Sequence, residues 1–344
     1  MYEILKDDFF LWLKGQLGQK EILAPRLKEE GYLFLPWDGE ELELTGYTNT
    51  LKPVKDAFFP QWEALIRYRM DKGKPVQVMG ENPATKPLIL FGVRPCDARS
   101  ILLLDRVFNG PKYKDQHYRE RRENTFVISL ACSEPASTCF CQDLGISPLA
   151  KEGSDILLVD LGDKFLALAD TLKGEEILQE RPFSPATPGS MDKFQALQGV
   201  SRQAAAASLV PEILSGELSQ VFVLPLWDEI YRKCLNCGVC TYLCPTCHCF
   251  DISDETTDTE GRRVRSWDSC MFGNFTQHGS GHNPRPTGKE RIRQRVLHKF
   301  KYFPENYLAV ACVGCGRCVA KCPVNFDIRE VLKRLGGCQD DMSM

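Results

Sequence analysis

The sequence lacks the features that direct a protein into or across a membrane. No apolar run approaches the roughly 20 residues that a helix needs to span a bilayer. The opening stretch, MYEILKDDFF, carries two Asp and one Glu where a secretion signal has basic residues followed by an apolar core. We therefore expect a cytoplasmic protein that does not act at a membrane.

The sequence also lacks the short motifs of common catalytic sites. It has no G-x-G-x-x-G after an expected strand and no phosphate-binding G-x-x-x-x-G-K-[ST] loop. It has neither a G-x-S-x-G nucleophile elbow nor an H-E-x-x-H zinc motif. Adjacent Cys-Cys pairs of the kind found in heterodisulfide-cleaving subunits are absent as well. We therefore assign no catalytic residue and expect the chemistry to occur on partner chains.

What the chain has in quantity is cysteine. Its 344 residues include sixteen Cys but only five His, and the formal net charge is −3. A weak negative charge disfavours general nucleic-acid binding. The hydrophobic and charged fractions, 43% and 26%, are those of an ordinary globular protein. Because thiols in a reducing cytoplasm rarely form disulfides, metal binding is the expected use of these cysteines.

The cysteine spacing indicates which metal centre to expect. The pattern C-x2-C-x2-C-x3-C-P occurs twice, beginning at Cys234 and at Cys312. In two-cluster ferredoxins, the fourth Cys of each motif binds the other cluster. The first expected [4Fe-4S] cluster uses Cys234, Cys237, Cys240 and Cys322. The second uses Cys312, Cys315, Cys318 and Cys244. Zinc, the alternative, ordinarily takes two separated cysteine pairs, which this spacing does not provide.

The segment between the two motifs is long and basic. A helix is expected at KERIRQRVLHKFKYF, and the segments after both Cys-Pro pairs also have a helical pattern. This organisation resembles alpha-helical ferredoxins, in which helices carry the two clusters. The basic residues between 285 and 301 are Arg285, Lys289, Arg291, Arg293, Arg295, Lys299 and Lys301. They either raise the cluster potential, dock an acidic partner or form a solvated face.

The first two thirds of the chain have the pattern of a mixed α/β domain. Strands are expected at YLFLPW, LILFGV, TFVISL and the pair DILLVDL/KFLALAD, and helices at KDDFFLWLKGQL and DKFQALQGVSRQAAAASL. RPFSPATPGSMD is expected to be a surface loop. The predicted fold is therefore α+β, with a mixed α/β domain over 1–225 and an alpha-helical ferredoxin domain over 226–344.

Four further cysteines follow two of the expected strands. Cys96 follows LILFGV in a loop held by Pro95, and Cys132 follows TFVISL, with Cys139 and Cys141 close behind. These thiols either hold a third cluster or pack as small apolar side chains, as free Cys often does. The spacing C-x6-C-x-C is no standard cluster signature and does not decide between the two.

The whole chain resembles one family of iron–sulfur proteins, the electron-transfer subunits of anaerobic sulfite reductases and the beta subunits of cytosolic sulfhydrogenases. The matching pieces include FGVRPCDARSILLLD, YRERR, CSEP with CFC, CPTCHCFD, WDSC, GHNPRPT and CVGCGRCVAKCPV. The first part is also similar to beta subunits of deazaflavin-dependent hydrogenases, in which cysteines at matching positions hold a cubane beside a flavin. This resemblance implies a third [4Fe-4S] cluster on Cys96, Cys132, Cys139 and Cys141. Because a clear flavin motif is missing, FAD is expected on a partner chain.

The resemblance implies an electron-transfer subunit of a cytoplasmic complex of anaerobic metabolism. One implied partner is a flavin- and NAD(P)-binding reductase subunit. The other is a catalytic or bifurcating redox subunit of the sulfite reductase, hydrogenase or heterodisulfide reductase-like kind. One alternative is a flavin-binding oxidoreductase subunit with its own substrate site in the first domain, and a regulatory iron–sulfur protein is another. Cys247, Cys249, Cys270 and Cys338 are left without an assigned role.

Overall fold

A large mixed sheet forms the centre of the first part of the molecule. The computed structural model describes all residues except 81–85, 204–208, 211 and 343–344. Within the described residues, this sheet has eight strands in the order β10-β1-β9-β8-β7-β6-β2-β3. The strands are β1 (Tyr2–Leu5), β2 (Glu21–Lys28), β3 (Gly31–Pro36), β6 (Leu88–Val93), β7 (Thr125–Leu130), β8 (Ile156–Asp160), β9 (Lys164–Ala169) and β10 (Ser184–Pro185). The central strands β2, β6, β7 and β8 run parallel, and the outer pairs are antiparallel.

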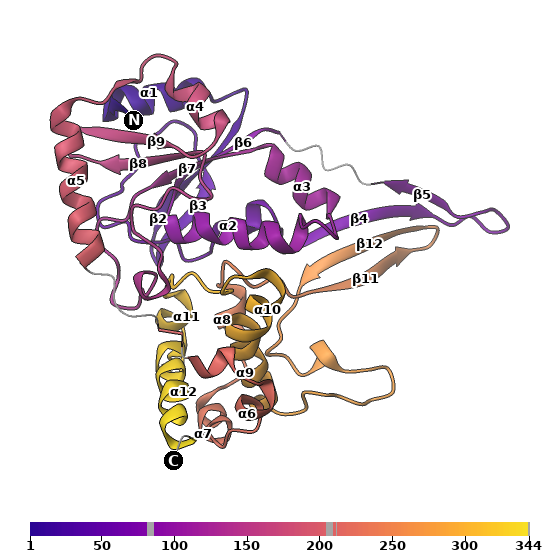
Figure 1. Cartoon of the computed structure of the whole chain (residues 1–344). Coiled ribbons are helices and arrows are strands. Elements are labelled where there is room, and N and C mark those ends of the chain that lie inside the picture. Colours follow the sequence, from indigo (N-terminus) through magenta and orange to yellow (C-terminus); the bar gives the residue numbers. More distant parts are fainter. Residues whose placement is uncertain (81–85, 204–208, 211, 343–344) are drawn as a thin grey trace.

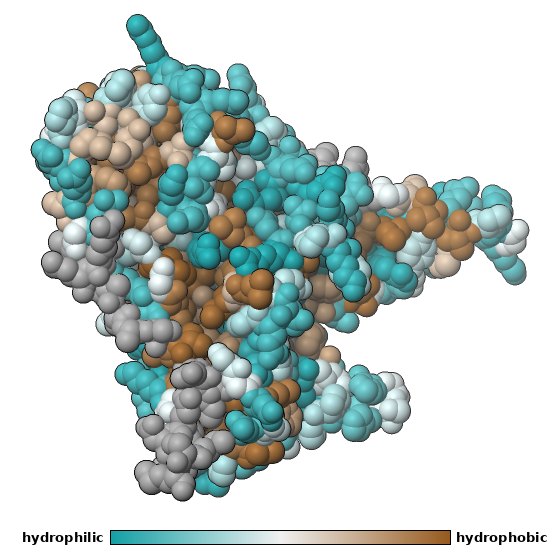
Figure 2. Space-filling view, in the orientation of Figure 1, coloured by the Kyte–Doolittle hydropathy of each residue, from teal (hydrophilic) through white to brown (hydrophobic). Residues whose placement is uncertain are grey.

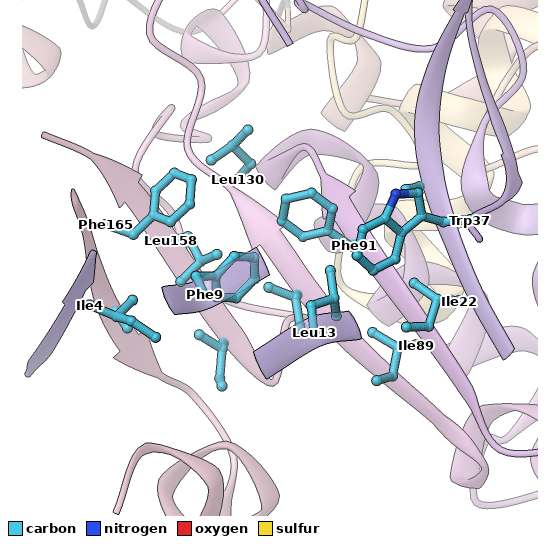
Figure 3. Close-up of a cluster of buried hydrophobic side chains, with 14 of the residues drawn as sticks. Ile4, Phe9, Leu13, Ile22, Trp37, Ile89, Phe91, Leu130, Leu158 and Phe165 are labelled. Carbon is cyan, nitrogen blue, oxygen red and sulfur yellow. The ribbon is translucent and has the colours of Figure 1, made fainter. Parts of the chain in front are cut away.

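The central strands are apolar on both faces because helices cover both faces. In β6, Ile89 and Phe91 belong to the core under helix α1 (Lys6–Gly15), together with Phe9 and Leu13 of that helix (Figure 3). Leu90 of the same strand points to the opposite core, beneath α2 (Pro95–Phe108) and α3 (Gln116–Glu123). Such continuous apolar runs are typical of parallel strands buried on both sides. The expected strands are confirmed.

Two local expectations in this part need correction. Cys96 lies in the first turn of α2, not in a loop, because Pro95 occupies the first helical position, where its fixed φ and missing N–H are tolerated. The expected surface loop at 181–192 contains β10 and the start of α5 (Pro188–Gln203). Residues 204–208 of the predicted helix at 192–209 lie outside the described residues. Within the described residues, the remaining α-helix of this part is α4 (Leu172–Leu178).

A second sheet forms an arm that projects from the body (Figure 1). Its order is β11-β12-β4-β5, with β4 (Trp62–Arg69), β5 (Gln77–Gly80), β11 (Phe250–Thr257) and β12 (Glu260–Trp267). The chain after Cys244 and Pro245 therefore enters a strand, and the helix expected there is wrong. Apolar side chains along the arm are exposed (Figure 2), with Val76 at 54% and Val78 at 67%. The domain boundary at residue 225 stays a prediction. β12 pairs with β4 across this position.

Apart from β11 and β12, the last third of the chain is helical. Its helices are α6 (Leu218–Phe222), α7 (Leu226–Ile230), α8 (Val239–Tyr242), α9 (Gly288–Leu297), α10 (Phe303–Tyr307), α11 (Arg317–Ala320) and α12 (Ile328–Met342), with a π-helix at His298–Tyr302. A capping box between Thr287 and Glu290 starts α9. Trp227, Val296 and Leu332 lie in the core that joins these helices. The helices expected at 289–303 and after Pro323 are confirmed, as is the α+β class. No helix in the described part of the chain is long and apolar enough to cross a bilayer.

Candidate iron–sulfur sites

The two ferredoxin motifs fold into the same local backbone shape. Asn236 and Gly238 in the first motif have φ of 54° and 76°, and Gly314 and Gly316 at the matching positions have 62° and 75°. Each loop then enters a short helix, α8 or α11. A left-handed residue on either side of the second Cys turns the loop sharply, which glycine allows without steric cost. The repeated spacing in the sequence therefore reflects a repeated loop structure.

Cysteines from both motifs surround one small cavity, which we call the first cluster site. Its cysteine lining consists of Cys234, Cys237, Cys240, Cys318 and Cys322. The thiol sulfurs of two of them accept backbone N–H groups, Cys234 from Asn236 at 3.3 Å and Cys322 from Phe326 at 3.1 Å. Such donors stabilise a thiolate. The four ligands expected for the first cluster are therefore gathered around a common space.

The cysteines of the second motif that are expected in the second cluster gather around Cys244 in what we call the second cluster site, and one of them, Cys318, also lines the first cluster site. Cys312, Cys315 and Cys318 each interact electrostatically with Cys244. Burial raises the pKa of the Cys312 thiol to about 12. The neighbouring Cys247 thiol, together with Lys299 and Thr246, holds the pKa of Cys244 well below its usual range. The four ligands expected for the second cluster are thus electrostatic neighbours.

Buried cations surround these cysteines. Lys55, Arg295 and Lys299 are only 2–3% exposed, and in the described structure none of them forms an ion pair with a carboxylate. Arg295 Nε has no hydrogen-bond partner among the described residues. A buried unpaired charge is costly. A cubane with four thiolate ligands carries a charge of about −2 and offers sulfur acceptors, so it fits this environment.

The same cysteines do not fit a mononuclear metal site. In the described part of the chain, no group of three or more His, Cys, Asp or Glu side chains converges closely enough to hold a single ion. A tetrahedral zinc site needs such convergence, with Zn–S distances of about 2.3 Å. In a cubane, each thiolate binds a different iron, so the sulfurs lie farther apart.

The four cysteines of the first part of the chain also lie near one another, in what we call the third cysteine group. β6 and β7 are adjacent parallel strands, so Cys96 and Cys132, which follow them, lie at the same edge of the sheet. Cys141 interacts electrostatically with Cys139 and Cys132, and Cys96 with Cys141. Burial raises the pKa of the Cys141 thiol to about 11. The structure brings all four cysteines together.

The third cysteine group packs directly against the second cluster site. Phe140 donates its N–H to the Gly314 carbonyl at 2.8 Å, and Cys139 Sγ donates to the Cys315 carbonyl at 3.8 Å. A Cβ at Gly314 would lie 2.4 Å from the Cys141 nitrogen, and a Cβ at Gly316 would lie 2.6 Å from the Thr138 oxygen. Only glycine permits this approach of the two loops.

One buried arginine holds this contact in place, and a second lies beside the third cysteine group. Arg317, next to Cys318, forms a bidentate pair with Asp97, next to Cys96, with both N–O distances at 2.6 Å. Both residues are almost fully buried. Arg94 donates to the carbonyls of Leu130 and Ala131 at 3.1 and 2.5 Å, just before Cys132. These cations also place positive charge beside the third cysteine group, where an anionic cluster would need it.

The other cysteines lie beside the second cluster site. Cys247 contacts Cys244, and Cys249 contacts Cys270. The ring centroids of His248 and His298 are 5.5 Å apart, and burial lowers the pKa of each histidine to about 4. Both rings are therefore neutral at pH 7. The side chain of Cys338 lies outside the described part of α12.

The basic segment between the motifs has more than one structural role. Arg295, Lys299 and Lys301 are buried, which rules out a solvated face for these three. Lys289 pairs with Asp228, whereas Arg265 pairs with Glu63 at the base of the arm. Lys55, in the 3-10 helix Val54–Ala57, was not predicted, because a single charged residue carries no signal of its burial or of a distant partner. The pairing of Arg317 with Asp97 was missed for the same reason.

Comparisons with known proteins agree with this geometry. Residues 233–326 match a family model described as a 4Fe-4S dicluster domain. The chain is 35% identical over 298 residues to sulfhydrogenase 2 subunit beta of Pyrococcus furiosus, and the match covers 85% of each chain. No solved structure matches the chain. The match to a two-cluster domain includes both ferredoxin motifs.

Proposed function

Because this chain belongs to the sulfhydrogenase beta-subunit family, we propose that it relays electrons between two other redox subunits of a cytoplasmic complex. One partner is a flavin- and NAD(P)-binding reductase subunit that carries FAD. The other is a catalytic or bifurcating subunit of the sulfite reductase, hydrogenase or heterodisulfide reductase-like kind. The chain itself is an iron–sulfur electron-transfer subunit with a 4Fe-4S dicluster domain. When bound, each cubane supplies one-electron redox chemistry.

The proposed ligands of the dicluster domain are crossed between the two motifs. One [4Fe-4S] cluster is assigned to Cys234, Cys237, Cys240 and Cys322. The other is assigned to Cys312, Cys315, Cys318 and Cys244. The crossed assignment is supported by the first cluster site, whose lining includes Cys322 of the second motif, with Cys318 also present, beside three cysteines of the first. The buried cations Arg295 and Lys299, neither of which pairs with a carboxylate in the described structure, support an anionic occupant.

A third [4Fe-4S] cluster is proposed on Cys96, Cys132, Cys139 and Cys141. The observation that carries the relay is the contact between the loop of Phe140 and the loop of Gly314, which links the third cysteine group to the second cluster site. Electron transfer is fast only over short gaps, so consecutive clusters must be close neighbours. The resulting order is third cysteine group, second cluster site, first cluster site.

The test of the relay uses the purified full-length chain with its clusters reconstituted anaerobically. The chain alone should not turn over NAD(P)H, and its clusters should become reduced by NAD(P)H only after the reductase subunit is added. Electron paramagnetic resonance follows the reduction of the clusters. Sustained NAD(P)H oxidation by the chain alone contradicts a pure relay. Clusters that never become reduced in the presence of the reductase contradict it as well.

A second candidate function is favoured by one cavity. A cavity of about 930 Å³ lies beside the third cysteine group, and its lining includes Cys132, Arg94, Tyr47 and Phe165. Its size and mixed apolar and polar lining are those of small-molecule and cofactor sites. A flavin bound there would make the chain an oxidoreductase subunit with its own substrate site. A flavin absorption spectrum from the purified chain, or its absence after incubation with FAD, decides between the two functions.

A further inference from the structure

One cysteine of the first cluster site reaches the protein surface. Of the cysteines in the described part of the chain, Cys237 alone is exposed, whereas Cys244 of the second cluster site is buried. The neighbouring Leu235 is 65% exposed. Both residues line the cavity of the first cluster site. A cluster bound there would lie close to solvent at Cys237, beside the exposed apolar side chain of Leu235.

Exposed basic residues flank two cysteines of the first cluster site in the sequence. Arg232 and Lys233 immediately precede Cys234, and Lys321 immediately precedes Cys322. All three residues are exposed, and none forms an ion pair within the described residues. We call the set Arg232, Lys233, Leu235, Cys237 and Lys321 the Cys237 face.

The acidic residues closest in the sequence are already paired. Lys289 Nζ lies 2.6 Å from Asp228 Oδ2, and Arg329 Nη2 lies 2.6 Å from Asp327 Oδ2. Glu229 forms an ion pair with Arg334. These carboxylates do not neutralise the Cys237 face, so its three cations remain available to an incoming partner. The surface thus combines an apolar centre, a metal-site thiol and a basic rim.

We propose that the Cys237 face is the docking site for an acidic redox protein whose own cofactor approaches the first cluster site. The inference rests on the proposed relay function and names the port at one end of it. Interfaces commonly join an apolar core to a polar rim, and complementary charge steers the encounter. Cationic side chains around an electron port favour partners with carboxylates around their own cofactor. The ligands of the second cluster site offer no comparable exposed thiol.

The experiment measures electron transfer from a defined acidic probe to the full-length chain. The probe is a reduced plant-type [2Fe-2S] ferredoxin, and stopped-flow absorbance gives the second-order rate constant. The test variant carries Lys233→Glu and Lys321→Glu. The matched control carries Lys28→Glu and Lys72→Glu, which reverse two exposed charges elsewhere on the chain. We expect the test variant to lose about tenfold in rate at low ionic strength and the control to change less than twofold.

The outcomes distinguish failure of the proposed docking site from failure of the proposed relay function. Raising the salt concentration should slow the unmodified chain and remove most of its difference from the test variant. If the test variant and the unmodified chain have equal rates, or if both double variants lose rate equally, the Cys237 face is not the docking site. Iron content and dithionite reduction are measured on every variant. A chain that binds no dithionite-reducible clusters overturns the relay function instead.

Discussion

Replacing Lys299 by Gln tests whether a buried cation sets the potential of the second cluster site. Lys299 Nζ lies 3.2 Å from Cys244 Sγ and 3.1 Å from both Thr246 Oγ1 and the Ala311 oxygen. Burial by itself lowers the pKa of Lys299, but the nearby thiols of Cys244, Cys247 and Cys312 raise it well above its usual range. The amine therefore stays charged at neutral pH, and its charge acts on any cluster held by Cys244.

The size of the effect follows from the position of the charge. Reduction adds one electron to a cluster, and the attraction between that electron and Lys299 favours the reduced form. For a separation of roughly 6 Å and an effective dielectric constant of about 20, Coulomb's law gives about 2.8 kcal/mol. Because about 1.4 kcal/mol corresponds to ~60 mV for one electron, Lys299→Gln should lower the midpoint potential by on the order of 100 mV.

Lys301 provides the matched control. It is as buried as Lys299, at 3%, but it donates to the carbonyls of Leu214 and Gly216 and pairs with Glu305. Lys301→Gln should therefore change stability without moving a cluster potential. Redox titration followed by electron paramagnetic resonance measures each potential separately. An unchanged potential in Lys299→Gln, with iron content intact, refutes the electrostatic role of Lys299, and so does an equal shift in Lys301→Gln.

Three further predictions address the clusters and the loops that join them. Cys244→Ser should weaken or remove the resonance signal of the cluster on Cys312, Cys315 and Cys318, and loss of the other dicluster signal instead contradicts the crossed ligation. Anaerobically prepared protein should contain about 12 iron atoms per chain, and Cys96→Ala about 8; a count near 8 in both means that the thiols of the third cysteine group only pack. Gly314→Ala should destabilise the fold by about 2 kcal/mol, because its φ is +62° and its Cβ would meet the Cys141 nitrogen at 2.4 Å. Gly279→Ala, with nothing within 4 Å of its Cβ, is the control, and equal melting temperatures for the two variants contradict the packing argument.

Local sequence patterns predicted the parts of the fold that depend on neighbouring residues. The apolar runs LILFGV and TFVISL form β6 and β7, and the basic amphipathic stretch after Thr287 forms α9. The arm was not predicted, because β11 and β12 carry many charged residues and because β12, which pairs with β11 on one side, pairs on the other with β4, far away in the sequence. The helix expected after Pro245 was also wrong. There, the pairing of β11 with β12 in a hairpin overrode a weak local preference for a helix.

The cysteine spacing identifies candidate ligands but says little about how one ligand set meets another. The contact between the ligand sets depends instead on residues other than cysteine. Gly314 and Gly316 leave room for the backbone around Cys141, and the buried pair of Arg317 with Asp97 fixes the same contact. Because removing one partner of a buried ion pair leaves a costly unpaired charge, loss of either charge should weaken the contact between the third cysteine group and the second cluster site. The continuity of the proposed relay therefore depends on these residues as much as on the thiols, and variants at these positions should slow electron transfer between clusters even when every cluster is retained.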